Sequence, residues 1–247
     1  MNSFFIEWSK QRARAIINFI FSIIYTGNGR YCPICEKNSR KFLSYGKQIK
    51  REDAICTNCG SFERHRYVWI YFQKFTNLFN NKPKMILHVA PESCFVPPLK
   101  KAFGNDYITA DLYSPRADVK MDITDIQYPD NYFDVVYCSH VLEHVQDDKK
   151  AMREFHRVLK SDGWAMLLVP ITTEKTYEDP SIMDPEERLK AFGQRDHVRC
   201  YGLDYIDRLR ESGFKVTIAK VEETFNREER ILMGLTDASG DIYFCTK

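Results

Sequence analysis

The chain has 247 residues, of which 44% are hydrophobic and 28% are charged. This composition is ordinary for a folded globular protein, and the length allows one sizeable α/β domain with a small appendage. No apolar run reaches the roughly 18 residues that a membrane-spanning helix needs. The net charge of +2 hides an asymmetry, because residues 1–79 carry a net of +8 and the remaining residues carry −6. A basic N-terminal region indicates one of two things: an anionic partner, such as nucleic acid, a membrane surface or a phosphorylated substrate, or a solvated basic face.

The first predicted element is an amphipathic helix within residues 1–28, which the sequence TGNG closes. Its main part, KQRARAIINFIFSIIY at residues 10–25, places basic residues before a run of mostly apolar ones. A signal peptide has a similar pattern, but no small-x-small cleavage sequence follows. We expect this helix to pack on the body of the protein; the alternative is a peripheral contact with a membrane surface.

Residues 29–66 form a predicted zinc-ribbon module. Two Cys-x-x-Cys pairs, Cys32 with Cys35 and Cys56 with Cys59, are spaced to deliver four thiolates to one tetrahedral Zn²⁺. All four ligands come from the protein, so we expect a structural ion that contributes to folding. The alternatives are a redox dithiol or a module without metal. Residues 61–66, SFERHR, follow the module, and they either contact an anionic substrate or tie the module to the main domain through ion pairs.

The other four cysteines are scattered, mostly in apolar surroundings: Cys94, Cys138, Cys200 and Cys245. This pattern favours one metal site and buried thiols in a reducing compartment over a secreted disulfide framework. We therefore expect a cytoplasmic protein.

Residues 67–83 form a predicted linking helix, and residues 84–247 form the main domain. In that domain strand patterns alternate with helix patterns, which indicates an α/β fold with a Rossmann-like sheet. The predicted strands are residues 85–90, 107–111, 119–122, 132–139, 164–170, 215–221 and 241–246, and the predicted helices are residues 95–103, 147–160 and 203–213.

The first strand of this domain ends in ILHVAPE, residues 86–92, where a nucleotide-binding fold normally has a glycine-rich loop. Asp111 ends the second strand, 21 residues after Ala90, and Asp122 ends the third. A carboxylate at the first position can accept two hydrogen bonds from a ribose, and one at the second can bond an adenine amine. The alternative is a pair of helix-capping aspartates.

The segment 84–170 resembles a class I S-adenosylmethionine-dependent methyltransferase, through YPDNYFDVVYCSHVLEHVQDDKKAMREFHRVLKSDGWAMLLVP at residues 128–170. It is most similar to a branch that joins a four-cysteine zinc module to this domain. Members of that branch carry LHxAPE, here Leu87 to Glu92, and FGQxDHVRxYG, here Phe192 to Gly202. The resemblance implies a seven-stranded sheet whose last strand is antiparallel.

The same resemblance implies which residues bind the cofactor. His88 stands where most of the superfamily has an acidic residue near the methionine amine, and Ala90 and Glu92 replace two glycines. We expect Glu92 to lie near the ammonium end of the cofactor. The remaining implied contacts are Asp111 at the ribose, Asp122 and Ile123 at the adenine, Ser139 and His140 near the methionine moiety, and Leu112, also expected to bind the cofactor.

A competing motif begins at His140, because His140, Glu143 and His144 fit H-x-x-E-H, an inverted zinc-peptidase pattern. On a helix these positions share one face. The nucleotide-binding topology around the motif disfavours a peptidase. A catalytic divalent ion remains open, since the related ubiquinone-type O-methyltransferases have Glu-x-x-Glu-His in this region.

Residues 171–202 form a long polar stretch that is expected over the active-site face, and such loops are often functional. Methyl transfer to an oxygen requires removal of a proton, a task that suits a positioned histidine. His144 and His197 are therefore the candidate bases, with a purely structural role as the alternative for each. Arg195 and Arg199 either clamp an acidic group of the acceptor or pair with neighbouring carboxylates such as Asp196 and Glu178.

The sequence thus predicts a methyltransferase with S-adenosylmethionine as cofactor and a structural zinc ion. The chain reads Tyr137-Cys-Ser-His140 where related amine methyltransferases have Asn/Asp-Pro-Pro-aromatic. We therefore expect the acceptor to be the hydroxyl of a small molecule or glycan. One alternative is an RNA methyltransferase that grips RNA with its basic zinc module. Another is a non-catalytic binding protein with a degenerate cofactor site.

Overall fold

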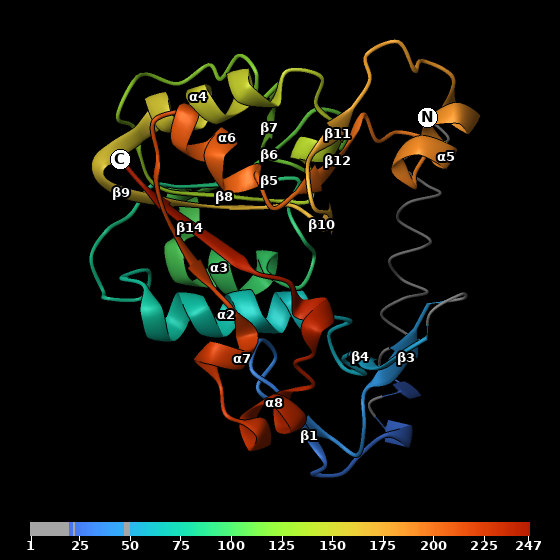
Figure 1. Ribbon diagram of the computed structural model, residues 1–247. Coiled ribbons are helices and arrows are strands. Elements are labelled where there is room, and N and C mark those ends of the chain that lie inside the picture. Colours follow the sequence, from blue (N-terminus) through green and yellow to red (C-terminus); the bar gives the residue numbers. More distant parts are fainter. Residues whose placement is uncertain (1–19, 22, 47–49) are drawn as a thin grey trace. The chain divides into compact units, whose positions relative to one another are not determined.

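The computed structural model describes residues 20–21, 23–46 and 50–247 (Figure 1). Most of the predicted N-terminal helix therefore lies outside the described residues. At its end, Ile20, Phe21, Ile23 and Ile24 are helical, and the three isoleucines are exposed.

The chain divides into two compact units, and the division differs from the predicted boundaries. The first unit comprises residues 1–79 together with residues 221–239, and the second comprises residues 80–220 and 240–247. The segment 221–239 was predicted to belong to the main domain, but it interrupts that domain and joins the N-terminal unit instead.

The first unit contains two antiparallel strand pairs and a set of helices. Strands β1 and β2 pair with each other, as do β3 and β4. The described elements are β1 (Arg30–Cys32), β2 (Lys37–Ser39), β3 (Leu43–Tyr45), β4 (Arg51–Ile55), α2 (Glu63–Phe75), α7 (Val221–Thr224), α8 (Arg227–Met233) and the 3₁₀ turn η3 (Asp237–Ser239).

Helix α2 begins earlier than the predicted linking helix, so residues 63–66 form its first turn. Arg66 is fully buried there, and its guanidinium donates only to main-chain carbonyls. A buried guanidinium is stable when its donors are satisfied in this way. Its acceptors are the carbonyl oxygens of Asp53, Ala54, Ser61, Met233 and Gly234. Arg66 thus joins the cysteine module to the segment 221–239 through hydrogen bonds to main-chain carbonyls and not through an ion pair.

The second unit is built on a seven-stranded mixed sheet, which confirms the predicted α/β architecture. The strand order is β13-β14-β9-β8-β5-β6-β7, and β14 runs antiparallel to both of its neighbours while the other pairs are parallel. The strands are β5 (Ile86–Val89), β6 (Tyr107–Asp111), β7 (Val119–Lys120), β8 (Phe133–Ser139), β9 (Leu159–Leu168), β13 (Lys215–Ala219) and β14 (Ile242–Thr246).

Helices cover both faces of this sheet. Figure 1 shows α4 (Asp148–Val158) and α6 (Tyr205–Glu211) on one face and α3 (Val96–Phe103) on the other. Strands β5 and β8 are almost wholly buried and rich in apolar residues, as expected for central parallel strands that are covered on both faces. Two 3₁₀ turns complete this part, η1 (Gly104–Asp106) and η2 (Leu142–His144).

Helix α4 ends two residues before the predicted position. It begins at its cap Asp147, whose side chain accepts a hydrogen bond from the Lys150 amide, and it ends at Val158. Leu159 is fully buried and already extended, so it starts β9 opposite Phe133. The polar residues after it interrupt the strand register, which resumes at Trp164. Burial of Leu159 therefore overrides the helical pattern at this boundary.

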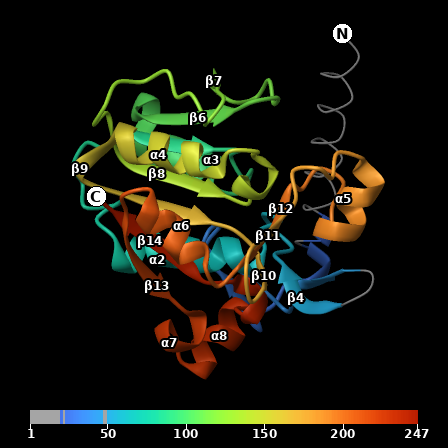
Figure 2. The same ribbon diagram turned by 45° about the horizontal axis from the view of Figure 1, so that its top comes forward.

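The polar stretch 171–202 is more structured than expected. It contains β10 (Ile171–Thr173), β11 (Tyr177–Glu178), helix α5 (Pro185–Phe192) and β12 (Arg199–Gly202). Strand β12 lies between β10 and β11. Figure 2 shows these strands together with α5 at one end of the main sheet.

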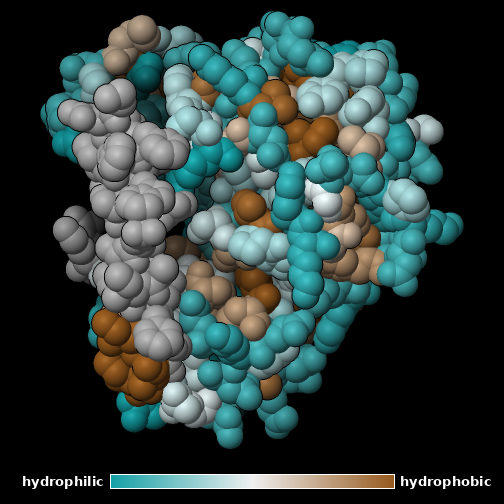
Figure 3. Space-filling view, turned by 180° about the vertical axis from the view of Figure 1, so that it is seen from behind, coloured by the Kyte–Doolittle hydropathy of each residue, from teal (hydrophilic) through white to brown (hydrophobic). Residues whose placement is uncertain are grey.

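The surface in Figure 3 is mostly hydrophilic, with hydrophobic residues in separate small groups. Within the described ranges, no helix combines the length and apolar character needed to cross a membrane.

Candidate functional site

A cavity of about 890 Å³ opens in the second unit, where the carboxyl ends of several strands meet. Ala90 follows β5, Asp111 ends β6, and His140 follows β8, so three neighbouring strands contribute to its wall. Ligands of open α/β sheets bind at this edge. Seven of the predicted site residues line the cavity: Ala90, Asp111, Leu112, Asp122, Ile123, His140 and His144.

Two wall residues have a backbone conformation that non-glycine residues rarely adopt. Ala90 has φ of 48° and His140 has φ of 54°. Such strain persists only where the surroundings enforce it, and it is common at functional sites. Main-chain bonds hold both residues, because the Ala90 amide donates to the Ala110 carbonyl and the His140 amide donates to the Leu168 carbonyl, each at 2.8 Å. The first loop contains no glycine, but Ala90 adopts the left-handed backbone conformation that a glycine commonly adopts at such a turn.

His88 and Glu92 lie outside the set of cavity-lining residues. The His88 ring is fully buried, with Nε2 2.6 Å from Glu92 Oε2 and Nδ1 2.7 Å from the Tyr107 hydroxyl. The Tyr137 hydroxyl donates to Glu92 Oε1 at 3.1 Å. The Glu92 carboxylate thus bonds both His88 and Tyr137, and its position at the cofactor's ammonium end stays a prediction.

The two predicted aspartates both line the cavity and both organise their own loops. Asp111 Oδ1 accepts hydrogen bonds from the amides of Tyr113 and Ser114. Asp122 Oδ1 accepts from the amide and hydroxyl of Thr124. These bonds form local turns rather than helix caps, because no helix of the described chain begins after Asp111 or Asp122 before the next strand. In each carboxylate they involve Oδ1 and not Oδ2.

The predicted histidines lie close together, although only two line the cavity. The His144 and His197 rings meet edge to face with centroids 4.6 Å apart, and His144 Nδ1 is 3.3 Å from Asp196 Oδ2. Burial, followed by the charge of His144, lowers the pKa of His197. His140 Nδ1 is 3.4 Å from Glu143 Oε1. His197 and Ser139 are buried beside the cavity rather than in its wall.

The two arginines of the polar stretch have different roles. Arg199 is buried, and its guanidinium donates to the carbonyls of Leu142, Val145 and Gln146 and pairs with Glu178. This arrangement excludes it as an acceptor clamp. Arg195 lines the cavity and pairs with Glu186 on α5.

Sequence reasoning missed two cationic residues of the cavity wall, Lys150 and Arg188. Lys150 lies on α4, which the sequence predicts as a helix, and Arg188 lies on α5, which the sequence analysis does not predict. No local motif marks either residue as part of the cavity wall.

The four cysteines of the first unit form a tight cluster. Their sulfur atoms all lie within 4.8 Å of one another, with Cys32 Sγ 3.6 Å from Cys59 Sγ and Cys35 Sγ 3.8 Å from Cys56 Sγ. Four sulfurs at 2.3 Å from one tetrahedral ion are about 3.8 Å apart. The Asn58 amide donates to Cys56 Sγ, so the second knuckle also has a main-chain donor for a thiolate.

Comparison with known proteins gives a match in the centre of the chain. Residues 99–167 match a family model described as a methyltransferase domain. The chain is 35% identical over 68 residues to ajmaline N-methyltransferase from Rauvolfia serpentina, which is 28% of this chain and 23% of that protein. It is 35% identical over 100 residues to phosphoethanolamine N-methyltransferase 3 from Arabidopsis thaliana, which is 40% of this chain and 19% of that protein. The chain therefore spans about a quarter or less of the length of these curated relatives.

Two solved structures resemble the chain more broadly. An S-adenosylmethionine-dependent methyltransferase from Mesorhizobium loti is 14% identical, with 72% of this chain and 97% of that chain covered and a TM-score of 0.48. A methyltransferase from Archaeoglobus fulgidus is 17% identical, with 74% and 94% covered and a TM-score of 0.45. The family match over residues 99–167 includes β6, β7, β8, α4 and the loops that follow these strands, and this segment supplies most of the residues that line the cavity. In this central segment the chain is similar to methyltransferase domains.

Proposed function

We propose that the chain is a methyltransferase that binds S-adenosylmethionine in the cavity of its second unit. The observation that carries this proposal is the position of the cavity, at the carboxyl ends of β5, β6 and β8, of which β6 and β8 lie within the region of the family match. The curated relatives support the reaction type, since all four are named methyltransferases.

The cavity residues fit the proposed cofactor. A volume of about 890 Å³ is within the range of small-molecule sites, about 300–1,000 Å³. Asp111 offers a carboxylate for the ribose, while Leu112 and Ile123 offer apolar surface for the adenine, with Asp122 beside them. The left-handed turn at Ala90 lets the backbone of the first loop approach a ligand closely, as glycine does in related sites.

The cofactor would supply a methyl group on a sulfonium, and the protein's part is to orient the acceptor toward it. His140 and His144 lie on the wall that follows β8, so they are placed to meet the acceptor. The pairing of His144 with Asp196 orients the imidazole. The neighbouring residues Val141 and Val145 provide apolar walls that exclude water.

For the acceptor we propose a small molecule or glycan with a hydroxyl group. The named relatives include N-methyltransferases, so an amine is the competing acceptor type. The cavity wall carries charges of both signs, so its charge alone does not select the acceptor: Lys150, Arg188 and Arg195 are cationic, and Asp111, Asp122, Asp147 and Asp196 are anionic.

RNA is a second candidate acceptor because the first unit has a basic aromatic surface. The Arg51 guanidinium lies 5.3 Å from the Tyr45 ring centroid, and the Arg64 guanidinium lies 5.1 Å from the Phe62 ring centroid. Tyr45 is half exposed. Aromatic and arginine side chains of this kind stack on bases in single-stranded nucleic acid.

We also propose that the four-cysteine cluster holds a structural Zn²⁺. The sulfur spacing supports this, as does the short module, which has little apolar core of its own to stabilise it.

Calorimetry with S-adenosylmethionine tests the main proposal. The zinc-loaded chain should bind it, and Asp111→Asn should weaken binding about tenfold or more, because the ribose loses a charged hydrogen-bond acceptor. Asp106→Asn is the matched control, since Asp106 is an exposed aspartate at the other end of the same strand and should leave binding unchanged. Absence of binding by the intact protein would favour the non-catalytic alternative instead.

Transfer of labelled methyl groups into a fractionated cell extract tests the acceptor type. A labelled small molecule or glycan supports the first candidate. Label in RNA, together with an RNA affinity that falls steeply with salt, would contradict the small-molecule or glycan acceptor and support RNA as the acceptor.

A further inference from the structure

Glu143, His144 and His197 form a cluster with the composition of a metal site. Each offers one ligand atom, and these three atoms lie within 4.8 Å of one another. Glu143 and His144 belong to the turn η2, and His197 comes from the loop between α5 and β12. Among the described residues, this cluster and the four cysteines are the groups with such a donor set.

Two of the three side chains have a buried atom without a hydrogen-bond partner. Glu143 is 2% exposed and its Oε2 has no partner, and His197 is 7% exposed and its Nε2 has no partner. Buried polar atoms are nearly always satisfied, so two orphaned atoms in one cluster point to a missing ion or water. A carboxylate and an imidazole that converge in a buried place fit a cation best.

One ring nitrogen of His197 is available to a metal ion, because the buried Nε2 atom has no hydrogen-bond partner. Metal-bound histidines commonly have their second nitrogen hydrogen-bonded, which fixes the tautomer and the ring orientation.

The two ligand-bearing segments are also tied together. The Val198 amide donates to the Glu143 carbonyl at 2.9 Å, which places His197 against η2. Arg199 then donates to the Leu142 and Val145 carbonyls on either side of Glu143 and His144. Such an outer framework keeps ligands near their binding geometry before the ion arrives.

We propose that Glu143, His144 and His197 bind one divalent transition-metal ion at the edge of the cavity. Two imidazoles and one carboxylate suit Zn²⁺, Co²⁺ or Fe²⁺ and leave coordination positions open. Ligands at 2.0–2.2 Å from a tetrahedral ion are about 3.4 Å apart. The three ligand atoms lie within 4.8 Å of one another, so each pair needs to approach by about 1.4 Å at most.

The set differs from the H-x-x-E-H motif in the sequence. Residues 142–144 form a 3₁₀ turn rather than an α-helix, so His140 does not share a helix face with Glu143 and His144. His140 is absent from the cluster, and His197 takes the place of the third ligand.

The location of the ion suggests its use. His144 lines the cavity, so the open positions would face a ligand bound there. This step rests on the proposed function: the ion would bind the acceptor's oxygen and favour its deprotonated form. His144 then acts as a metal ligand rather than as the base that the sequence predicted.

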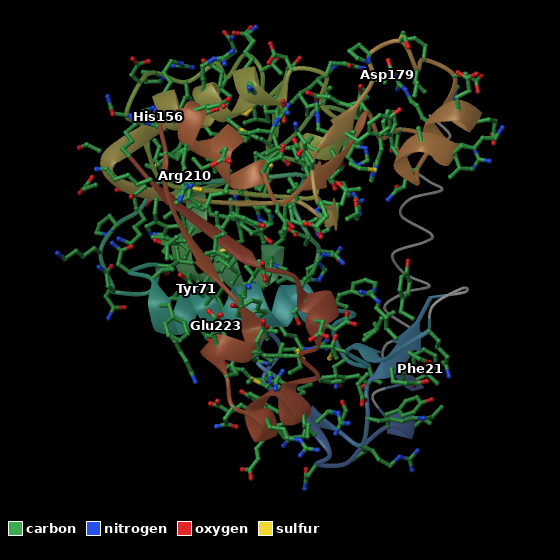
Figure 4. All side chains as sticks on the ribbon, viewed as in Figure 1. Phe21, Tyr71, His156, Asp179, Arg210 and Glu223 are labelled. Carbon is green, nitrogen blue, oxygen red and sulfur yellow. The ribbon has the colours of Figure 1, made fainter. Side chains whose placement is uncertain are left out.

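Binding of Co²⁺ to the full chain, with its cysteine cluster already loaded with zinc, tests the site. Calorimetry should show one further equivalent, and the absorption spectrum should lack the intense thiolate band that entry into the cysteine cluster would produce. Glu143→Gln, His144→Ala and His197→Ala should each weaken this binding at least tenfold. His156→Gln is the control, because His156 lies on α4, well separated from the polar stretch around Asp179 (Figure 4).

Glu143 and His197 are buried, so their variants are checked for folding by circular dichroism. If they unfold, the partly exposed His144 decides the question alone. The proposal is overturned if the wild type binds no Co²⁺ outside the cysteine cluster, or if folded His144→Ala or His197→Ala binds it with wild-type affinity. Calorimetry with S-adenosylmethionine on the same samples keeps the two proposals separate, since cofactor binding without Co²⁺ binding contradicts only the metal site.

Discussion

At the scale of single residues, Ala90 shows how a loop without glycine can still serve a nucleotide-type site. The residue adopts φ of 48°, and its amide bonds to the next strand at Ala110. A left-handed alanine costs about 1–2 kcal/mol relative to a right-handed one. The surrounding structure must offset this cost, and the buried network of His88, Glu92 and Tyr137 directly beneath the loop is the evident support.

This support role leads to a prediction for Glu92. Glu92→Gln replaces the carboxylate that bonds His88 and Tyr137 and leaves a weaker, neutral pairing. We expect the free energy of unfolding to fall by about 1–3 kcal/mol, as for other buried hydrogen bonds to charged groups. Urea denaturation measures the change, with the exposed Glu174→Gln as control. Cofactor affinity should fall less than in Asp111→Asn. An equal or larger fall would indicate that Glu92 contacts the cofactor directly.

At the scale of elements, a buried charge cluster joins α4 to the polar stretch. Asp148 on α4 bonds Arg208 on α6 and accepts a hydrogen bond from the Tyr201 hydroxyl on β12. Arg199 lies 3.8 Å away, and Glu178 bridges the two arginines. The cluster thus fixes β11 and β12 to the main sheet's helices and indirectly positions the loop that carries His197.

Asp148 also gives the stability a specific pH dependence. Burial raises its pKa, but the Arg208 hydrogen bond and the Arg199 charge outweigh burial, so the pKa lies below 3.8. A carboxyl whose pKa is lowered by folding stabilises the protein above about pH 4 and loses this effect as the pH falls through the lowered value.

We therefore expect Asp148→Asn to lower the free energy of unfolding at pH 7 by about 3 kcal/mol, because it leaves Arg199 and Arg208 with Glu178 as their remaining carboxylate partner. The difference from wild type should shrink below pH 4. Denaturation curves from pH 3 to 7 measure it, and a difference that stays constant over this range would contradict the assignment. Asp207→Asn is the control, because that side chain is 63% exposed.

At the scale of the whole molecule, the chain crosses between its two units more than once. The first unit uses residues from both ends of the sequence, and Arg66 joins them through the carbonyls of Met233 and Gly234. The cysteine cluster lies in this same unit, next to the Asp53 and Ala54 carbonyls that Arg66 also contacts in β4. Loss of a metal there should therefore disturb the whole first unit.

Cys59→Ser should lower the zinc content by one equivalent per chain, because a tetrahedral site loses one of its four ligands. The first unit should then become sensitive to protease, since metal binding contributes to its folding. Metal analysis and limited proteolysis measure both effects. Cys200→Ser, which changes a cysteine outside the cluster, should match the wild type in both. Unchanged zinc in Cys59→Ser would contradict the four-cysteine site.

Local patterns in the sequence were sufficient for the main architecture and part of the site. Apolar runs of strand length alternate with segments of helical periodicity. This alternation predicts the order of strands and helices, because the strands of such a sheet are buried on two faces. Asp111 and Asp122 could be placed at strand ends for the same reason, and the spacing of the cysteines indicated their cluster.

Only the tertiary structure decided the rest, because it depends on contacts between distant segments. The Val198 amide brings His197 to Glu143, and no periodicity encodes that bond. The Glu92 carboxylate bonds His88 and Tyr137 from two different strands, a contact that no local pattern encodes. Residues 221–239 belong to the N-terminal unit, where the Met233 and Gly234 carbonyls accept hydrogen bonds from Arg66 far away in the sequence.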